Sequence, residues 1–202
     1  ATHALCVTDD LAAMVAAVKD SLARRPVVLV LSGGLGPTED DLTREAVAEA
    51  LGRPLEHHEE LLDQIRARFA SRGFVMGDSN RKQALIPRGA SAIPLTGTAP
   101  GFYLQHDRTL VIALPGVPWE LRQMWEDTVE PLLQTGRRPH SQTSAGVSGG
   151  AGRALSPGNG TPNTRPRRGV VMACLRIRQA CARRSWLSVP SLGRCITSAG
   201  RS

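Results

Sequence analysis

The chain has 202 residues, and 25 Lys and Arg against 18 Asp and Glu give it a formal charge of +7. The sign is divided along the sequence, because residues 1–136 carry a net charge of −5 whereas residues 137–202 carry 12 Arg and no acidic residue. The length allows one hydrophobic core, the absence of a long apolar run argues against a membrane-spanning protein, and the four cysteines lack the spacing of a zinc site.

The first elements expected are a helix and a buried strand. Apolar residues recur at helical spacing over residues 11–22, directly after the capping sequence Thr8-Asp9-Asp10, and Pro26 ends the helix. The run Val27–Leu31 is continuously apolar, which is typical of a strand buried on both faces of a parallel sheet.

A glycine-rich turn follows this strand. Gly33, Gly34 and Gly36 allow a close approach of the backbone to a ligand, and their amides together with the Thr38 hydroxyl are suited to hold a phosphate or pyrophosphate. The alternative interpretation is a tight strand-to-helix turn that binds nothing.

Three carboxylates stand where the next helix is expected to begin, over residues 39–51. Asp40 and Asp41 cannot both face the same way, so one is a candidate ligand for Mg²⁺, Mn²⁺ or Co²⁺ and the other for orienting water or capping the helix. Thr38 and Asp41 form a capping-box-like pair. The alternative is that both acids simply favour the positive end of the helix dipole.

A third helix is expected over residues 59–72, with Gly73 as its stop, and a polar segment follows it. In that segment Asn80, Arg81 and Lys82 are candidates for offsetting phosphate charge. A solvated polar loop is the competing interpretation. His57 and His58 precede the helix and are expected to be solvated.

The remaining elements of the first part are short strands and a last helix. Strands are expected over residues 92–95, 102–105 and 109–114, and Pro118 suits the first position of the helix. The far wall of a ligand site would come from the loops between these elements, through Gly97, Thr98, Gly101 and Gly116. The same loops could equally be plain connections. Trp119 and Trp125 are expected to pack against the sheet.

Strands that alternate with helices predict a three-layer α/β/α fold with a mostly parallel sheet for residues 1–136. The single cysteine of this part, Cys6, favours a reducing compartment, and we expect a cytoplasmic protein. Because the chain begins at Ala1 without Met, we also expect that its N-terminus is incomplete.

Residues 137–202 have a different composition, dominated by Arg, Gly, Ser, Pro and Ala. This segment buries too little apolar surface to fold by itself, so we expect a tail that is disordered or non-native. A basic arm for nucleic acid or an anionic membrane is the alternative. Trp186 is the only Phe, Tyr or Trp in this segment, which argues against nucleic acid as a partner.

Four motifs occur in one order: Ser32–Thr43, Asn80–Gln83, Gly97–Gly101 and Leu114–Pro118. Together they resemble the N-terminal domain of the competence/damage-inducible CinA family, which is similar to the molybdopterin-binding MoaB/MogA-like superfamily. The resemblance covers roughly residues 5 to 140 and implies the MoaB/MogA-like fold. Family aspartates in the matching loop favour Asp40 for the ligand side.

Two departures from the family pattern stand out. Family members open with a strand and a Gly-Thr-Glu-type loop before the first helix, and this sequence lacks both. We therefore expect an open sheet edge and the loss of one wall of the site. Beyond about Thr143 the family's further strand, subdomain and deamidase domain are not recognisable, so no deamidase activity is expected.

The resemblance implies a metal-dependent hydrolase that cleaves the pyrophosphate of ADP-ribose or a similar nucleotide. Asp40 or Asp41 would hold the divalent ion, and Arg81 or Lys82 would stabilise developing negative charge. The alternatives are binding of molybdopterin without hydrolysis, an inactive truncated relative, and nucleic-acid binding by the tail. We expect a small nucleotide or pterin ligand, no membrane contact, and self-association as a dimer.

Overall fold

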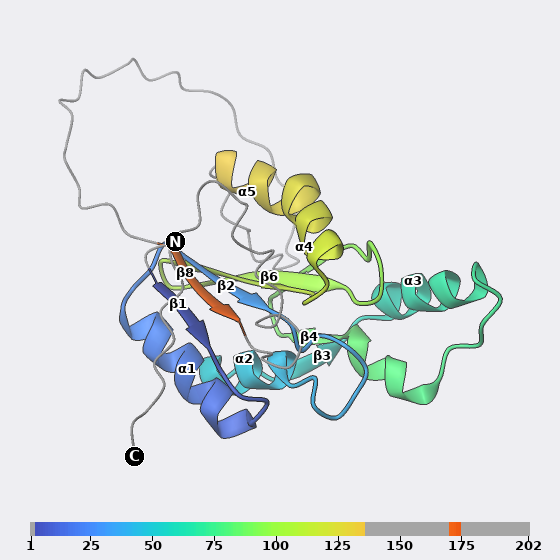
Figure 1. The fold of residues 1–202 in the computed structure, drawn as a ribbon, viewed down its shortest axis with the longest axis horizontal. Helices are drawn as coiled ribbons and strands as arrows, with labels where there is room; N and C mark the ends of the chain where they lie inside the picture. The colour runs from blue at the N-terminus through green and yellow to red at the C-terminus, as the bar shows by residue number, and fades with distance from the viewer. Residues whose placement is uncertain (1–2, 136–169, 175–202) are drawn as a thin grey trace, which may run out of the picture.

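The computed structural model describes residues 3–135 and 170–174, which form a six-stranded sheet with helices on both faces (Figure 1). The strand order is β1-β8-β2-β7-β6-β5. The strands are β1 His3–Cys6, β2 Val28–Ser32, β5 Ser91–Ile93, β6 Gly101–His106, β7 Thr109–Leu114 and β8 Val170–Cys174, with a separate pair formed by β3 Leu55–His57 and β4 Leu85–Pro87. The helices are α1 Leu11–Ala23, α2 Thr43–Leu51, α3 Glu59–Ala70, the 3₁₀ segment η1 Asp78–Ala84, and α4 Pro118–Met124, which continues through the π-helical turn η2 Trp125–Val129 into α5 Glu130–Gln134.

The sheet is mixed. β1, β8, β2 and β7 run parallel, whereas β6 is antiparallel to β7 and β5 is antiparallel to β6. The tight turn at Asp107 between β6 and β7 explains the antiparallel edge, because a short turn can join only antiparallel strands. The expected α/β class is confirmed, with an antiparallel edge added to the parallel part.

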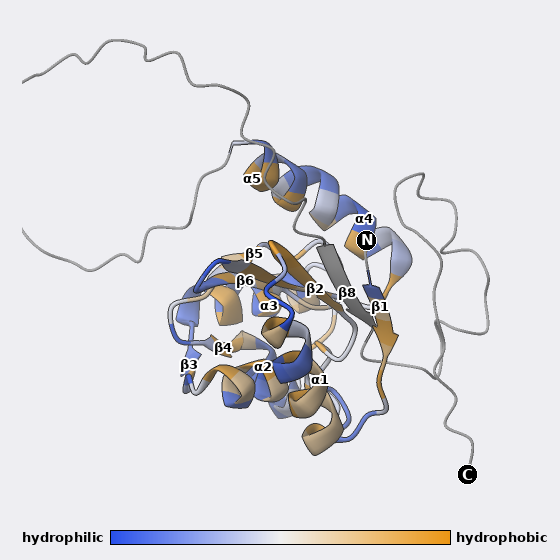
Figure 2. Cartoon of the chain, turned by 90° about the vertical axis from the view of Figure 1, so that its left-hand side faces the viewer, coloured by the Kyte–Doolittle hydropathy of each residue, from blue (hydrophilic) through white to orange (hydrophobic). Residues whose placement is uncertain are grey.

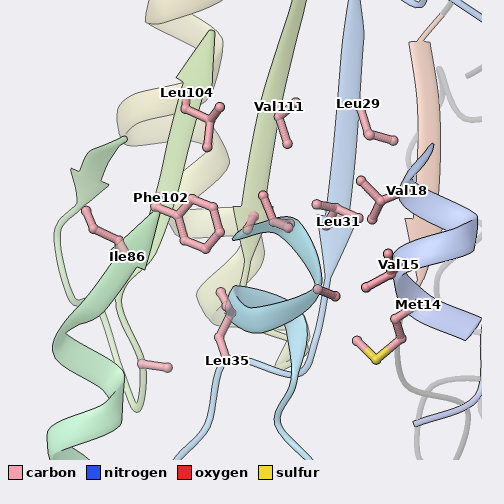
Figure 3. Close-up of a cluster of buried hydrophobic side chains, with 14 of the residues drawn as sticks. Met14, Val15, Val18, Leu29, Leu31, Leu35, Ile86, Phe102, Leu104 and Val111 are labelled. Carbon is pink, nitrogen blue, oxygen red and sulfur yellow. The ribbon is translucent and has the colours of Figure 1, made fainter. Parts of the chain in front are cut away.

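Each face of the sheet has its own hydrophobic core. Leu29 and Leu31 of β2 pack with α1 and α2, while Val28 and Val30 of the same strand pack with Met124 and Val129 on the other face. The larger cluster is drawn in Figure 3, and Figure 2 shows α4 and α5 on one side of the sheet and α1 and α2 on the other. Because both faces of β2 are covered, its sequence is apolar throughout, as the run Val27–Leu31 predicts.

The start of α1 agrees with the expectation from the sequence, and the start of α2 does not. α1 begins as expected, with the Asp10 carboxylate accepting from the Ala13 amide at 2.8 Å. α2 begins at Thr43 and not at about Glu39, so that expectation is wrong by one turn. The reason is local, since the Asp41 carboxylate binds the amide and hydroxyl of Thr38 and thereby closes a turn before the helix.

The first strand and the tail also differ from expectation. A strand, β1, does precede α1, which corrects the expectation that the sequence lacks a strand before the first helix. The apolar run Ala4–Val7 is within the length range of strands, so its pattern could have predicted this one. Within residues 137–202, the segment 170–174 forms β8 between β1 and β2, so the edge of β2 is paired. The rest of the expected tail lies outside the described residues.

Candidate functional site

The glycine-rich turn lies at the carboxyl ends of two neighbouring parallel strands, β2 and β7. Ser32 and Leu114 are register partners at these ends, and the Gly33 amide donates to the Leu114 carbonyl at 3.0 Å. The turn after β7 comes equally close, because a Cβ on Gly116 would lie 3.2 Å from the Gly33 Cα. Ligands of open α/β sheets bind at this edge. Both turns are therefore placed where a ligand site is expected.

The glycines of the turn are required by its conformation and by close neighbours. Gly33 and Gly34 have positive φ angles of 96° and 65°. A Cβ on Gly34 would lie 2.4 Å from the Thr43 Oγ1, and one on Gly36 would lie 2.4 Å from the Asp41 Oδ2. The turn can pack against these two polar side chains only because it has no side chains of its own there.

In the backbone of the turn, the carbonyls have hydrogen-bond partners whereas most of the amides do not. All four carbonyls of residues 33–36 accept from the protein: Gly33 from the Thr43 hydroxyl, Gly34 from the Thr43 amide, and Leu35 and Gly36 from the Arg44 guanidinium. In the described part of the chain, the amides of Gly34, Leu35 and Gly36 donate no hydrogen bond. Unpaired amides in buried residues are rare. Successive backbone amides without partners are the arrangement that anion-binding turns in other proteins use.

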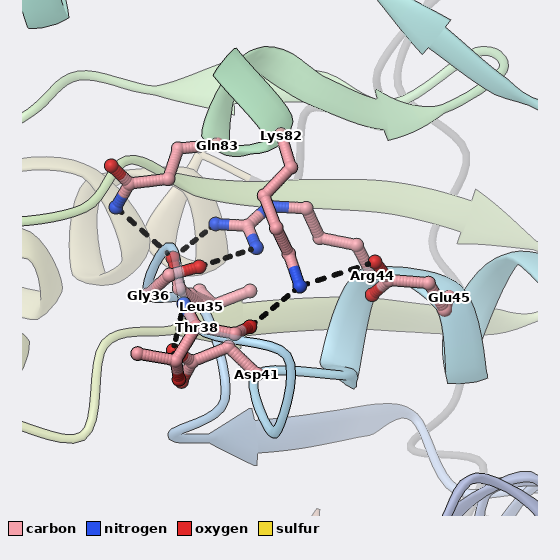
Figure 4. A network of polar contacts seen from close by, with 8 residues as sticks. All are labelled: Leu35, Gly36, Thr38, Asp41, Arg44, Glu45, Lys82 and Gln83. Carbon is pink, nitrogen blue, oxygen red and sulfur yellow. Dashed lines mark hydrogen bonds and ion pairs between the residues drawn. The ribbon is translucent and has the colours of Figure 1, made fainter. Parts of the chain in front are cut away.

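Arg44 supports the turn by donating to the Leu35 and Gly36 carbonyls (Figure 4). Its side chain is 1% exposed, and burial lowers its pKa to about 10, against the opposing attraction of Glu45 and Asp41. The guanidinium therefore remains charged at neutral pH. A buried cation beneath a turn that leaves amides unpaired favours an anionic ligand on the other side.

The two aspartates proposed as metal ligands have different surroundings. Asp41 is 1% exposed, and its Oδ2 accepts from the Thr38 amide at 3.0 Å and from the Thr38 hydroxyl. Asp40 is exposed and makes no ion pair or hydrogen bond with another described residue. No cluster of three or more His, Cys, Asp or Glu suited to a metal occurs among residues 3–135 and 170–174. Of the two aspartates, Asp40 is therefore the one whose carboxylate is available to a divalent ion.

The segment η1 braces the turn with side chains from its last half. The Gln83 amide nitrogen donates to the Leu35 carbonyl at 3.4 Å and to the Thr98 carbonyl at 3.1 Å, and Asn80 orients it through a 2.9 Å hydrogen bond. The Lys82 ammonium donates to the Thr38 carbonyl at 2.7 Å and lies 3.6 Å from the Glu45 carboxylate. Figure 4 shows the contact of Gln83 with Leu35 and those of Lys82 with Thr38 and Glu45.

Of the three charge-offsetting candidates in η1, Arg81 is the one that is still available. Its side chain is 58% exposed and meets Asp78 only at 4.0 Å. Asn80 and Lys82 are occupied with the protein itself.

The loop before β6 is fixed by a buried acid that the sequence did not reveal. Glu120, in the first turn of α4, is 1% exposed and accepts from both the amide and the hydroxyl of Thr98. A Cβ on Gly97 would lie 2.3 Å from the Glu120 carboxyl carbon. Gly97 and Thr98 are therefore brought to the site through Gln83 and Glu120, while Gly101 lies within β6, where a Cβ would be 2.8 Å from the Ala113 carbonyl.

Four other residues complete the comparison with the sequence. His57 is exposed and His58 partly exposed, as expected. Trp125 packs against the sheet, but Trp119 is 55% exposed, so the expectation for Trp119 is wrong. A seven-residue helix that buries Glu120 and Met124 turns position 119 outward.

Three residues that hold the site loops in place were missed as functional candidates: Arg44, Gln83 and Glu120. Arg44 gave no signal, because an arginine within a helix is ordinarily read as solvated. Gln83 is the last residue of the motif Asn80–Gln83, and its place in that motif was the signal that could have identified it. Glu120 follows Pro118 in a first helical turn, where acids are common for electrostatic reasons.

Comparison with known proteins gives a consistent result. The family described as "Probable molybdopterin binding domain" matches residues 1–135. A CinA-like protein of Nostoc punctiforme is 48% identical over 113 residues, 55% of this chain and 27% of that protein. A CinA-like protein of Anaeromyxobacter dehalogenans is 46% identical over 142 residues, 70% of this chain and 34% of that protein. The chain thus spans about a third of the length of these curated relatives.

A solved structure supports the same assignment of fold. The crystal structure of the protein CinA with unknown function from Thermoplasma acidophilum is 32% identical and superposes with a TM-score of 0.54 over 63% of this chain and 72% of that one. Among the described residues, no helix is long and apolar enough to cross a bilayer.

Proposed function

Because the chain belongs to the family described as "Probable molybdopterin binding domain", we propose that the turn of residues 33–38 binds the phosphate of a molybdopterin-type ligand. The proposal extends to a nucleotide diphosphate such as ADP-ribose, which presents the same kind of anion. The small-molecule site would include the turn after β7, at Gly116, and the loop at Thr98.

One observation carries the proposal: the carbonyls of residues 33–36 are all engaged and the amides of residues 34–36 are not. A carbonyl facing the ligand would repel a phosphate, whereas an amide donates to it. Arg44 and Thr43 donate hydrogen bonds to these carbonyls, and no side chain in the described residues accepts from the three amides. An anion satisfies these donors without rearrangement of the loop.

The direct test is a titration of ¹⁵N-labelled full chain with molybdopterin, ADP-ribose and inorganic pyrophosphate, followed by two-dimensional NMR. We expect the largest amide shifts at residues 34–36, with the Gly89 amide as an internal reference at a distant positive-φ glycine. The compound that binds with the highest affinity identifies the class of ligand. If the largest shifts lie away from the turn, the turn is not the binding site. If none of the three compounds saturates the chain, the proposed class of ligand is wrong.

Metal-dependent hydrolysis of the nucleotide pyrophosphate is a second candidate, supported by Asp40. This carboxylate is exposed and unengaged, and Mg²⁺ is commonly held by one or two carboxylates together with substrate phosphates. The ion would supply charge neutralisation and an activated water. Arg81 is free to approach a phosphate, whereas Lys82 serves the Thr38 carbonyl and Glu45.

The two candidates are separated by incubating the chain with ADP-ribose and Co²⁺, Mn²⁺ or Mg²⁺. Release of AMP above a metal-free blank supports hydrolysis. Saturable binding of ADP-ribose with no AMP supports a binding role alone.

A further inference from the structure

Two large apolar side chains are exposed directly after the turn that contacts Gly33. Trp119 is 55% exposed and Val117 is 36% exposed, and all four residues of the stretch 116–119 are exposed. None of the four carries a charged group. Single exposed apolar residues are ordinary, but a run of them beside a candidate site is the kind of surface that lines ligand pockets.

Trp119 differs from most aromatic side chains of the described residues. Four of the other five pack in or against one of the two hydrophobic cores: Phe69, Phe102, Tyr103 and Trp125. The fifth, Phe74, is exposed beyond the end of α3. Trp119 is therefore the exposed aromatic ring whose neighbours in the chain contact the site.

Contacts on both sides of Trp119 fix its place. On one side, Gly116 approaches Gly33, since a Cβ on Gly116 would lie 3.2 Å from the Gly33 Cα. On the other side, Glu120 accepts from the amide and the hydroxyl of Thr98. Gly116 and Trp119 are three residues apart, so their Cα atoms lie within about 11 Å of each other. The backbone of Trp119 is thus held between residues that contact the glycine turn and the Thr98 loop.

The geometry of α4 directs the indole toward the turn. Side chains of a helix lean toward its N-terminus, so each covers the surface of the preceding turn. Because α4 begins at Pro118, the side chain of Trp119 leans over residues 116–118, beside Gly33. Since this side chain is exposed, it is open to a ligand at the carboxyl ends of β2 and β7.

We propose that Trp119 is the stacking platform for the planar heteroaromatic ring of the ligand whose phosphate the glycine turn binds. The inference rests on the proposed function and assigns a residue to the other half of the ligand. Adenine and pterin rings are both planar, so both present a π face to an indole. The amides of residues 34–36 and the indole would then bind the two ends of one molecule.

This division supplies a selectivity that the turn alone does not have. Unpaired amides donate to any phosphate that fits between them. The side chains that surround the turn are polar, and the exposed indole is the surface beside them that suits a ring. A ligand with a ring therefore gains an interaction that inorganic pyrophosphate lacks.

The test compares compounds that have a ring with one that has none, in the full chain. Calorimetry gives the Kd of ADP-ribose, molybdopterin and inorganic pyrophosphate for wild type, Trp119→Leu and Trp119→Phe. We expect Trp119→Leu to weaken the better-binding ring compound by about tenfold or more, and pyrophosphate by less than about twofold. Trp119→Phe keeps an aromatic ring and should restore most of the affinity.

Phe74→Leu removes the other exposed ring and is the matched control, which should leave all three affinities unchanged. Both positions are exposed, so each variant should melt within about two degrees of wild type. Fluorescence provides a measurement in the unmodified chain. ADP-ribose should quench tryptophan emission and pyrophosphate should not, and Trp119→Phe should remove the quenching.

The outcomes separate this inference from the proposed function. If wild type binds pyrophosphate, but Trp119→Leu weakens ADP-ribose and molybdopterin no more than Phe74→Leu does, the phosphate site stands and the role of Trp119 is overturned. If none of the three compounds binds wild type, the proposed function fails and this inference fails with it. If Trp119→Leu instead converts a dimer to a monomer in ultracentrifugation with unchanged affinities, the surface is an interface between copies, which also overturns the proposal.

Discussion

The Glu120 carboxylate holds Thr98 by both its amide and its hydroxyl, at 3.1 Å each, across 22 residues of sequence. The same arrangement occurs in the glycine turn, where Asp41 holds the amide and hydroxyl of Thr38. In both cases a glycine, Gly97 or Gly36, lies against the carboxylate. Two buried acids thus fix two site loops by the same means, and each acid is a positioning residue.

Glu120→Ala should release the Thr98 loop. The two donors of Thr98 lose a charged acceptor, which we expect to cost about 1–3 kcal/mol of unfolding free energy, measured by urea denaturation. Ligand affinity should fall at the same time, because Gly97 and Thr98 would no longer be held at the site. Glu126→Ala, at an exposed position just beyond α4, is the matched control and should change neither quantity. If Glu120→Ala leaves ligand affinity unchanged, the loop of Gly97 and Thr98 is not part of the ligand site.

Arg44→Met should destabilise the chain more strongly, by about 3–5 kcal/mol, because it leaves the Leu35 and Gly36 carbonyls and the nearby acids without their cation. Denaturation of Arg24→Met, an exposed arginine at the end of α1, provides the control.

The pH dependence of this loss follows from the pKa of Arg44, which burial lowers to about 10. Arg44 is charged in both the folded and the unfolded chain below that pH, so the difference between wild type and Arg44→Met should be constant from pH 6 to 8.5. Because the folded pKa is the lower one, the stability that Arg44 contributes can change only above about pH 10, where it rises. A difference that varied strongly near neutrality would contradict this assignment.

The sequence predicted the parts of the site that depend on local backbone and failed for those that depend on tertiary contacts. Gly33 and Gly34 stand directly after an apolar strand, and this pattern alone indicates a special turn. The burial of Arg44 and Glu120 depends on packing between elements that are far apart in sequence. The role of Lys82 likewise becomes visible only when η1 lies over the turn.

The same division explains the fold. α1 and β2 follow from periodicity and a continuous apolar run, whereas the start of α2 depends on the bond from Asp41 to Thr38. β1 overlaps the short apolar run Ala4–Val7, which could have been recognised, whereas β8 could not be foreseen because its pairing partners lie more than 130 residues away in sequence. The dimer expected from the sequence remains a prediction.

Gly36→Ala tests the contact between the turn and Asp41. Its Cβ would lie 2.4 Å from the Asp41 Oδ2, so either the carboxylate or the turn must move, at a cost of about 1–3 kcal/mol. Ligand affinity measured by calorimetry should fall at least tenfold. Gly73→Ala is the matched control, because it is strained at φ 74° but has open space around it. It should lower stability by about 1 kcal/mol and leave affinity unchanged; equal losses of affinity in both variants would indicate a global effect.

Asp40→Asn separates hydrolysis from binding. Asp40 is exposed and makes no hydrogen bond or ion pair with another described residue, so the substitution should leave the melting temperature within about one or two degrees of wild type. If Asp40 holds the divalent ion, release of AMP from ADP-ribose should fall by at least tenfold, while binding of ADP-ribose without metal should be unchanged. Asp127→Asn, an exposed aspartate in η2, controls for the loss of one negative charge. If Asp40→Asn turns over at the full rate, Asp40 is not the metal ligand. Because Asp41 is engaged by Thr38, metal-dependent hydrolysis would then have no support from either aspartate of this turn.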